Sequence, residues 1–117
     1  MTHAAERAGR LPGLDADAIE WEPRRYGPAG AGGVTALLPK LGTAELEAVA
    51  AHVRLSARRG VKTWPVGRMV DAIDRATARL LDRGDPLRRK MEALLPIVTG
   101  YDAEMTRLGL TGYLKTF

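Results

Sequence analysis

The sequence contains no cysteine among its 117 residues, and this absence excludes several kinds of chemistry. A chain without cysteine forms no disulfide, no thiolate metal site and no cysteine nucleophile. The two histidines, His3 and His52, lack the spacing of a zinc site. Ser56 is the only serine, and its spacing from His52 does not indicate a nucleophile. We therefore expect the chain to bind no metal or cofactor and to hold no catalytic residue.

Long apolar runs are also missing. No stretch approaches the ~20 apolar residues that span a bilayer. Residues 1–7 lack the apolar segment of a secretory signal peptide. We therefore expect no membrane partner and a cytoplasmic location. The hydrophobic content of 45% is ordinary for a globular protein, which argues against a fully disordered chain.

Glycine and proline are concentrated in the first third of the chain. Residues 1–42 hold seven of the thirteen glycines and four of the seven prolines, so we expect a flexible tail over residues 1–18. Residues 19–22 alternate apolar and polar, and residues 34–38 are compatible with a strand. A Gly-rich loop joins them, and it lacks the Gly-Lys-Ser/Thr ending of a P-loop. Residues 19–42 are therefore predicted to form a short hairpin or linker, with Pro23 restricting the first strand to a sheet edge.

From residue 43 onward, apolar residues recur at the three-and-four spacing of amphipathic helices. Thr43, Asp85 and Asp102 are predicted helix N-caps, and Pro65 suits a first helical position. Four helices are expected, at residues 43–59, 65–83, 86–99 and 103–116. The predicted fold class is thus mainly α, with a helical domain over residues 43–117.

The helical spacing also predicts which side chains form the core. Five apolar residues are expected to pack into one cluster: Met69, Ile73, Leu80, Leu94 and Leu95. Trp64, Tyr101 and Met105 are also expected to be core residues. Pro96 removes a hydrogen bond within the third helix, so we expect that helix to kink or end early.

The charge pattern favours a solvated helix surface over a binding site. The net charge is +4, and arginine outnumbers lysine fourteen to four. Asp71 and Arg75 are four residues apart and Arg79 and Asp82 are three apart, so each pair can interact along one helix. The only basic cluster lies at residues 88–90. The sequence therefore argues against nucleic acid as a partner, although this cluster keeps a small nucleic-acid-binding domain as a third alternative.

Three segments of the helical region resemble a known family. Residues 64–75, 85–90 and 95–108 are similar to the N-terminal region of bacterial acyl-CoA reductases. These enzymes are relatives of the fatty-acid reductase of bacterial bioluminescence, within the aldehyde dehydrogenase superfamily. The resemblance covers about residues 41–117. Its most specific part is residues 100–108, with Gly-Tyr at the start, Glu-Met in the middle and Leu at the end.

The resemblance implies NADPH-dependent reduction of a fatty acyl thioester to an aldehyde, through an acyl-cysteine. Neither the cysteine nor a nucleotide-binding unit is present, so no catalytic or cofactor residue transfers to this numbering. The expected role is a helical N-terminal portion that is inactive alone and packs against the rest of the reductase. A stand-alone helical interaction module is the alternative, and an oligomer is compatible with both.

The candidate interface is the end of the fourth helix, with Leu110, Tyr113, Leu114 and Phe117. This helix pattern runs to Phe117 with no end signal, so we expect a continuation in a longer polypeptide. Acyl chain length, the choice between NADPH and NADH and the oligomeric state do not follow from the sequence.

Overall fold

The computed structural model describes residues 4–117, which form a three-stranded sheet followed by four α-helices. The elements are β1 (Glu6–Arg7), β2 (Glu20–Tyr26), β3 (Val34–Lys40), α1 (Thr43–Arg59), the 3-10 turn η1 (Val61–Thr63), α2 (Val66–Leu81), α3 (Pro86–Thr99) and α4 (Ala103–Leu114). The mainly α fold with a short strand element is as predicted, and the hairpin is confirmed. No helix within residues 4–117 is long and apolar enough to cross a membrane.

β3 is the central strand of the sheet. It pairs in parallel with β1 and antiparallel with β2, in the register Glu20↔Lys40 to Tyr26↔Val34. Pro23 lies in the edge strand β2, as predicted. No strand of the described sheet pairs with the outer side of β2, so the missing N–H of Pro23 removes no inter-strand hydrogen bond on that side. β1 was not predicted. Residues 1–3 of the expected tail lie outside the described residues, and mobility over residues 4–18 stays a prediction.

Two of the predicted helix starts are confirmed by side-chain hydrogen bonds. The Asp85 carboxylate accepts from the backbone N–H of Leu87 at 2.9 Å, and the Asp102 carboxylate accepts from that of Met105 at 2.7 Å. Between these helices Gly100 has a φ of +78°, the left-handed conformation that glycine adopts without strain. Asp85, Gly100 and Asp102 therefore fix the turns that fold α2, α3 and α4 together.

Two other boundary predictions are wrong. Thr43 is already helical, and Gly42 occupies the cap position without a side-chain bond. Pro65 precedes α2 as its cap instead of opening it. α3 spans Pro86–Thr99, the range predicted from the sequence, so Pro96 does not end the helix early and a kink stays a prediction. Pro96 affects the preceding turn, where the Glu92 carbonyl loses its helical donor, and the helix continues despite the loss of this one hydrogen bond.

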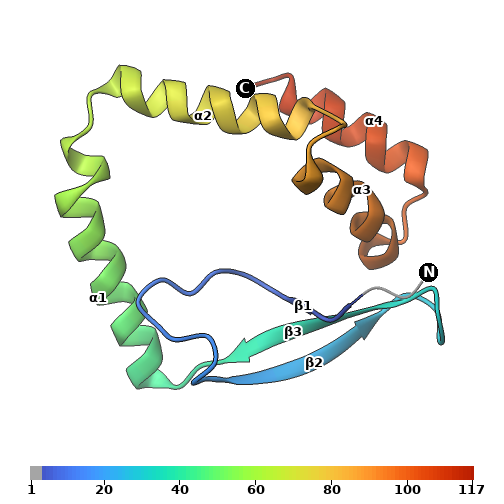
Figure 1. Cartoon of the computed structure of the whole chain (residues 1–117), viewed down its shortest axis with the longest axis horizontal. Helices are drawn as coiled ribbons and strands as arrows, with labels where there is room; N and C mark the ends of the chain where they lie inside the picture. Colours follow the sequence, from blue (N-terminus) through green and yellow to red (C-terminus); the bar gives the residue numbers. More distant parts are fainter. Residues whose placement is uncertain (1–3) are drawn as a thin grey trace.

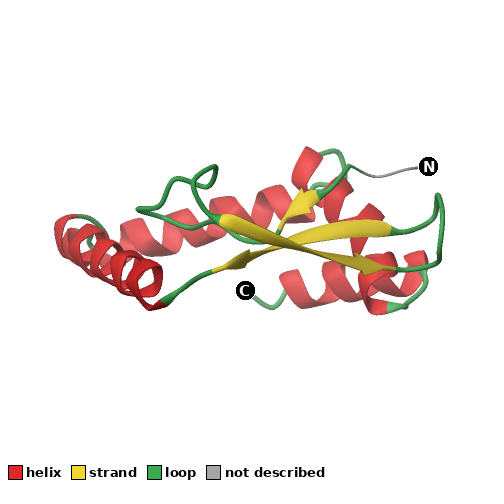
Figure 2. Ribbon diagram, turned by 90° about the horizontal axis from the view of Figure 1, so that it is seen from below, coloured by secondary structure: helices red, strands yellow, loops and turns green. Residues whose placement is uncertain are grey.

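The elements surround an open frame (Figure 1). The Cα atoms extend over 45 × 36 × 18 Å with a radius of gyration of 17.3 Å, whereas a compact domain of this length has about 13 Å. A view turned by 90° shows how thin the arrangement is (Figure 2). The accessible surface is 8472 Å², whereas about 6,200 Å² is typical of a folded monomer of this mass.

The frame is closed where the sheet meets α3. The Lys90 Nζ lies 2.6 Å from a carboxylate oxygen of Glu6 in β1. A Cβ placed on Gly27, in the hairpin loop, would lie 2.6 Å from the Cγ2 of Ile97. Gly27 also has a φ of +85°. Only glycine therefore lets the hairpin loop approach α3 this closely.

The predicted core is corrected by this open shape. Ile73 is 55% exposed, so it does not belong to a core cluster with the other four residues. Tyr101 and Met105 are also exposed, which contradicts their predicted core positions. The physical reason is that Ile73 lies on an exposed side of α2, whereas Tyr101 and Met105 line an open groove beside Leu95 of α3 instead of a closed interior. Helical spacing identifies an apolar face without identifying what covers it.

The predicted ion pairs are also corrected. Arg79 bonds to Asp85 at 2.9 Å instead of Asp82, which links the end of α2 to the start of α3. The pair between Asp71 and Arg75 is not among the ion pairs of residues 4–117. The charged side chains near the α2–α3 turn therefore connect two helices, whereas the sequence spacing predicted ion pairs along the surface of one helix.

Candidate functional site

The centre of the α2–α3–α4 unit is a buried arginine, Arg88, which has no solvent-exposed surface. Its guanidinium donates to the Leu80 carbonyl of α2 at 2.8 Å and to the Thr111 hydroxyl of α4 at 2.9 Å. It also pairs with Glu92, one helical turn along α3, at 3.1 Å. No buried side-chain polar atom within residues 4–117 lacks a hydrogen-bond partner. Arg88 therefore fastens three helices at one point, and we call Arg88 and these three partners the arginine hub.

The Glu92 carboxylate is shared between two arginines. Arg83, in the α2–α3 turn, donates to it at 3.2 Å, beside the contact from Arg88. The hydrogen bond from Arg83, followed by that from Arg88, lowers the pKa of Glu92 against the opposing effect of burial. Glu92 is thus held as a carboxylate, which is the form that compensates the buried Arg88 charge.

Two further carboxylates pair with arginines at helix starts. The hydrogen bond from Arg79 lowers the pKa of Asp85. The hydrogen bond from Arg107 lowers the pKa of Glu104 in the first turn of α4, and the same contact raises the pKa of Arg107. The Arg79–Asp85 pair links α2 to α3, whereas the Glu104–Arg107 pair lies within α4. Each carboxylate has a cation as its partner, which favours its charged form.

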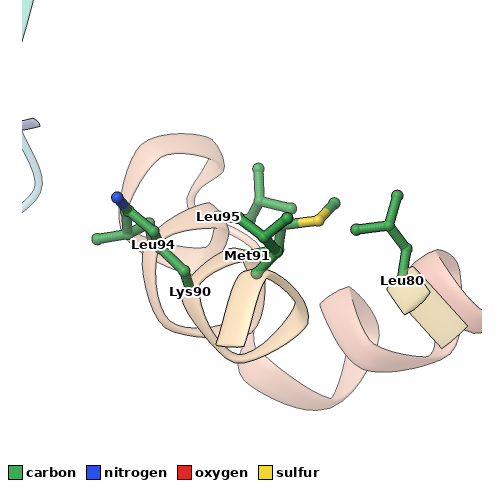
Figure 3. Close-up of a pocket in the computed structure, with 6 residues that line it drawn as sticks. Leu80, Lys90, Met91, Leu94 and Leu95 are labelled. Atoms are coloured by element: carbon green, nitrogen blue, oxygen red, sulfur yellow. The ribbon is translucent and has the colours of Figure 1, made fainter. Parts of the chain in front are cut away.

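An apolar groove opens beside the arginine hub, with a volume of about 360 Å³. It is lined by Leu80 of α2 and by α3 residues Leu87, Lys90, Met91, Leu94 and Leu95. In Figure 3 the Met91 side chain extends from α3 toward Leu80 of α2. Three predicted core residues, Leu80, Leu94 and Leu95, thus meet here, at a surface groove instead of in a closed interior.

The predicted interface residues at the end of α4 do not all face outward. Tyr113 and Phe117 are 65% and 67% exposed, and their rings meet edge to face with centroids 5.2 Å apart. Leu110 is half-buried, and Leu114 is buried as one of the two buried apolar side chains of residues 4–117. Sequence reasoning did not predict the exposure of Met105 and Leu108 on the same helix. The exposed apolar surface of α4 therefore consists of Met105, Leu108, Tyr113 and Phe117, and we call it the α4 surface.

The basic cluster predicted at residues 88–90 does not form a basic surface. Arg88 is fully buried in the hub, and Lys90 is bonded to Glu6. Phosphate binding needs accessible cations, so Arg89 is the one member of the cluster without such a contact in the described residues. The geometry thus gives little support to the nucleic-acid alternative.

A second groove, of about 370 Å³, lies between α1 and the turn at η1. Its lining includes His52, Val53, Ser56 and Trp64. His52 is exposed, as predicted, and closely approached by the backbone at Gly13. The Arg68 guanidinium lies 4.0 Å from the centre of the Trp64 ring, which leaves Trp64 half-buried at the groove edge instead of in a core.

Chemistry-bearing side chains do not converge in either groove. Within residues 4–117, no group of three or more His, Asp and Glu side chains is placed to hold a metal ion. The geometry consists of a tightly bonded helix junction and several uncovered apolar surfaces. No protein-family model, curated protein or solved structure matches the chain.

Proposed function

We propose that this chain is the helical N-terminal portion of an acyl-CoA reductase and acts by packing against the part of the enzyme that performs the chemistry. The reaction would be NADPH-dependent reduction of a fatty acyl thioester to an aldehyde. That part is supplied by the same polypeptide or by a separate chain, in the cytoplasm.

The observation that supports this proposal most directly is the α4 surface. Its residues Met105 and Leu108 belong to the segment at residues 100–108 that resembles the reductases, and both are exposed. Apolar side chains grouped on one helix mark a contact with another protein surface. The exposed aromatic pair of Tyr113 and Phe117 extends this surface by one further turn. The family-like segment therefore coincides with uncovered apolar area.

The chemistry implied by the family requires a cysteine, which attacks the thioester and holds the acyl group until hydride arrives. This sequence contains no cysteine. In the proposal the chain contributes position and stability, while the thiol and the nicotinamide site belong to the other part of the enzyme.

The test compares the 117-residue chain with a longer polypeptide that contains it. Each is incubated with a long-chain acyl-CoA and NADPH, and NADPH oxidation is followed. We expect no turnover from the chain alone and turnover from the longer polypeptide or from the chain mixed with a co-purifying catalytic subunit. Turnover by the purified 117 residues would contradict the proposal.

A pair of variants tests the surface itself. Tyr113→Asp places a charge within the α4 surface and should weaken association with the catalytic part at least tenfold. Lys115→Asp also adds negative charge, two residues away at an exposed position outside that surface, and should leave association nearly unchanged. Equal effects of the two variants would remove the α4 surface from the proposal.

The second candidate is a stand-alone interaction module that uses the same aromatic pair on an unrelated protein. The exposure of Tyr113 and Phe117 favours it equally. A native polypeptide of 117 residues without a reductase partner would select this candidate, whereas a longer polypeptide with reductase activity would exclude it.

A further inference from the structure

The amount of uncovered surface is larger than the α4 surface accounts for. The chain exposes about 2,200 Å² more than a folded monomer of 12.7 kDa. Its radius of gyration of 17.3 Å exceeds the ~13 Å of a compact domain of this length. Apolar side chains on this open arrangement are therefore available to a partner surface.

Another uncovered apolar feature away from α4 is one side of α2. Val66, Met69, Ile73, Ala76 and Leu80 follow one another at alternating spacings of three and four. This is the a/d spacing of two helices that pair along their length. Val66 is 75% exposed and Ile73 55% exposed, and Val70 beside them is also exposed. We call Val66, Met69, Ile73, Ala76 and Leu80 the α2 stripe.

The α2 stripe continues into the apolar groove without interruption, because Leu80 belongs to both. Figure 3 shows Leu80 facing the α3 side chains across this groove. At the other end of α2, Val66 projects from the helix start with no covering element in the described chain. α2 thus has the exposed apolar side chain of Val66 at its N-terminal end. Fourteen residues later, at Leu80, it borders the open apolar groove.

We propose that two copies of this chain pair through their α2 helices in antiparallel orientation, so that Val66 of each copy reaches the groove of the other. With the two-fold axis at Ile73, residue 66 of one helix lies opposite residue 80 of its partner, since both are seven residues from the axis. Ile73 packs against Ile73, and the small Ala76, three residues from the axis, lies one residue out of register from Met69 of the partner helix, four residues from the axis. Such an interface is isologous and closes with two copies.

The pairing uses surface that is open on α2 itself. The excess of about 2,200 Å² per copy also includes the α4 surface, so pairing through α2 covers only part of it. A partner of different sequence would have to provide its own matching stripe and groove, whereas a second copy provides both at the required separation. This inference goes beyond the proposed function, because it uses α2 instead of α4.

Mass measurement over a concentration series tests the pairing. In multi-angle light scattering or sedimentation equilibrium, the chain should have twice its 12.7 kDa mass at micromolar concentration. Ile73→Asp places two like charges at the axis and should raise the dimer dissociation constant at least a hundredfold. Ala78→Asp adds the same charge on the exposed opposite side of α2 and should change the constant less than threefold.

Far-UV circular dichroism of each variant shows whether the helices are kept. If Ile73→Asp loses helix, Val66→Asp provides the same test, because Val66 has no covering element whose loss could unfold the chain. A wild-type mass of 12.7 kDa at every concentration overturns the proposal. A dimer that resists both stripe variants, or one that Ala78→Asp weakens equally, also overturns it. Since neither variant touches α4, these outcomes leave the Tyr113→Asp test unaffected.

Discussion

The two ends of α2 lie in different environments. Its C-terminal end joins α3 and α4 at the arginine hub, where a fully buried guanidinium bonds to all three helices. Its N-terminal half continues from α1 and η1, and we call α1, η1 and residues 66–73 the arm. α1 has substantial contacts only with η1 among the described elements. One amphipathic helix therefore passes from a junction fixed by hydrogen bonds to a region whose apolar side chains are exposed.

The difference teaches that amphipathic spacing and burial are separate properties. Both halves of α2 have the same three-and-four apolar spacing, yet Leu80 meets α3 and Ile73 meets solvent. What distinguishes them is the turn chemistry that follows. Asp85 and the Arg79–Asp85 pair return the chain onto α2 after residue 81, whereas within residues 4–117 no comparable ion pair joins α1 to the N-terminal half of α2.

Removing the hub is expected to have the largest effect. Arg88→Ala leaves the Leu80 carbonyl and the Thr111 hydroxyl without their donor and removes a buried charge partner of Glu92. We expect a loss of about 3–5 kcal/mol in the free energy of unfolding, as for other broken buried pairs. Urea denaturation followed by circular dichroism measures this. Arg89→Ala, at the exposed neighbouring position, should cost less than about 0.5 kcal/mol, and similar losses from both variants would remove the contrast between hub and surface.

The cap of α4 gives an intermediate effect. Asp102→Ala removes the carboxylate that accepts from the Met105 N–H and should cost about 1 kcal/mol. Asp102→Asn keeps a capping oxygen and should restore most of that loss, measured in the same denaturation series. A fully unchanged midpoint for Asp102→Ala would mean that α4 is held by packing alone.

Acid should weaken the hub through Glu92. Because the pKa of Glu92 is lowered in the folded chain, its contribution is present above its unfolded pKa of about 4.3 and is lost as pH falls through the lowered value. The free energy of unfolding should therefore decrease between pH 6 and pH 3. Glu92→Gln should reduce this decrease, whereas Glu22→Gln in β2 should not. Identical acid profiles for wild type and Glu92→Gln would exclude this carboxylate as the cause.

The smallest effect is expected in the arm. The sequence alone predicts a cost of about 2–5 kcal/mol for Ile73→Ala, the range for a buried site. The structure revises this to about 0.5 kcal/mol, the surface range, when measured at a concentration where the chain is monomeric. Leu114→Ala, at a buried position in α4, is the matched control and should retain the larger cost. A loss above 2 kcal/mol for Ile73→Ala in the monomer would show that the arm folds against its own chain.

The sequence predicted those parts of the fold that depend on local chemistry. Asp85, Gly100 and Asp102 determine helix ends through their own backbone neighbours, so their roles were readable from residue type and spacing. The arginine hub was not readable, because a basic cluster at residues 88–90 looks the same whether Arg88 points to solvent or between helices. Its partners are backbone and hydroxyl groups of distant residues, which have no sequence signature. The exposure of Ile73 and Tyr101 was missed because it depends on which elements are absent from their surroundings.

The contact between Glu6 and Lys90 has a consequence for the order of folding. The turns around α3 join residues close in sequence, whereas this ion pair joins the first strand to the third helix across most of the chain. Contacts between distant residues form late, because a long loop must close before they contribute. During synthesis, which proceeds from the N-terminus, the sheet emerges well before its partner on α3. We therefore expect the sheet to remain without its contact to α3 until Lys90 has emerged from the ribosome.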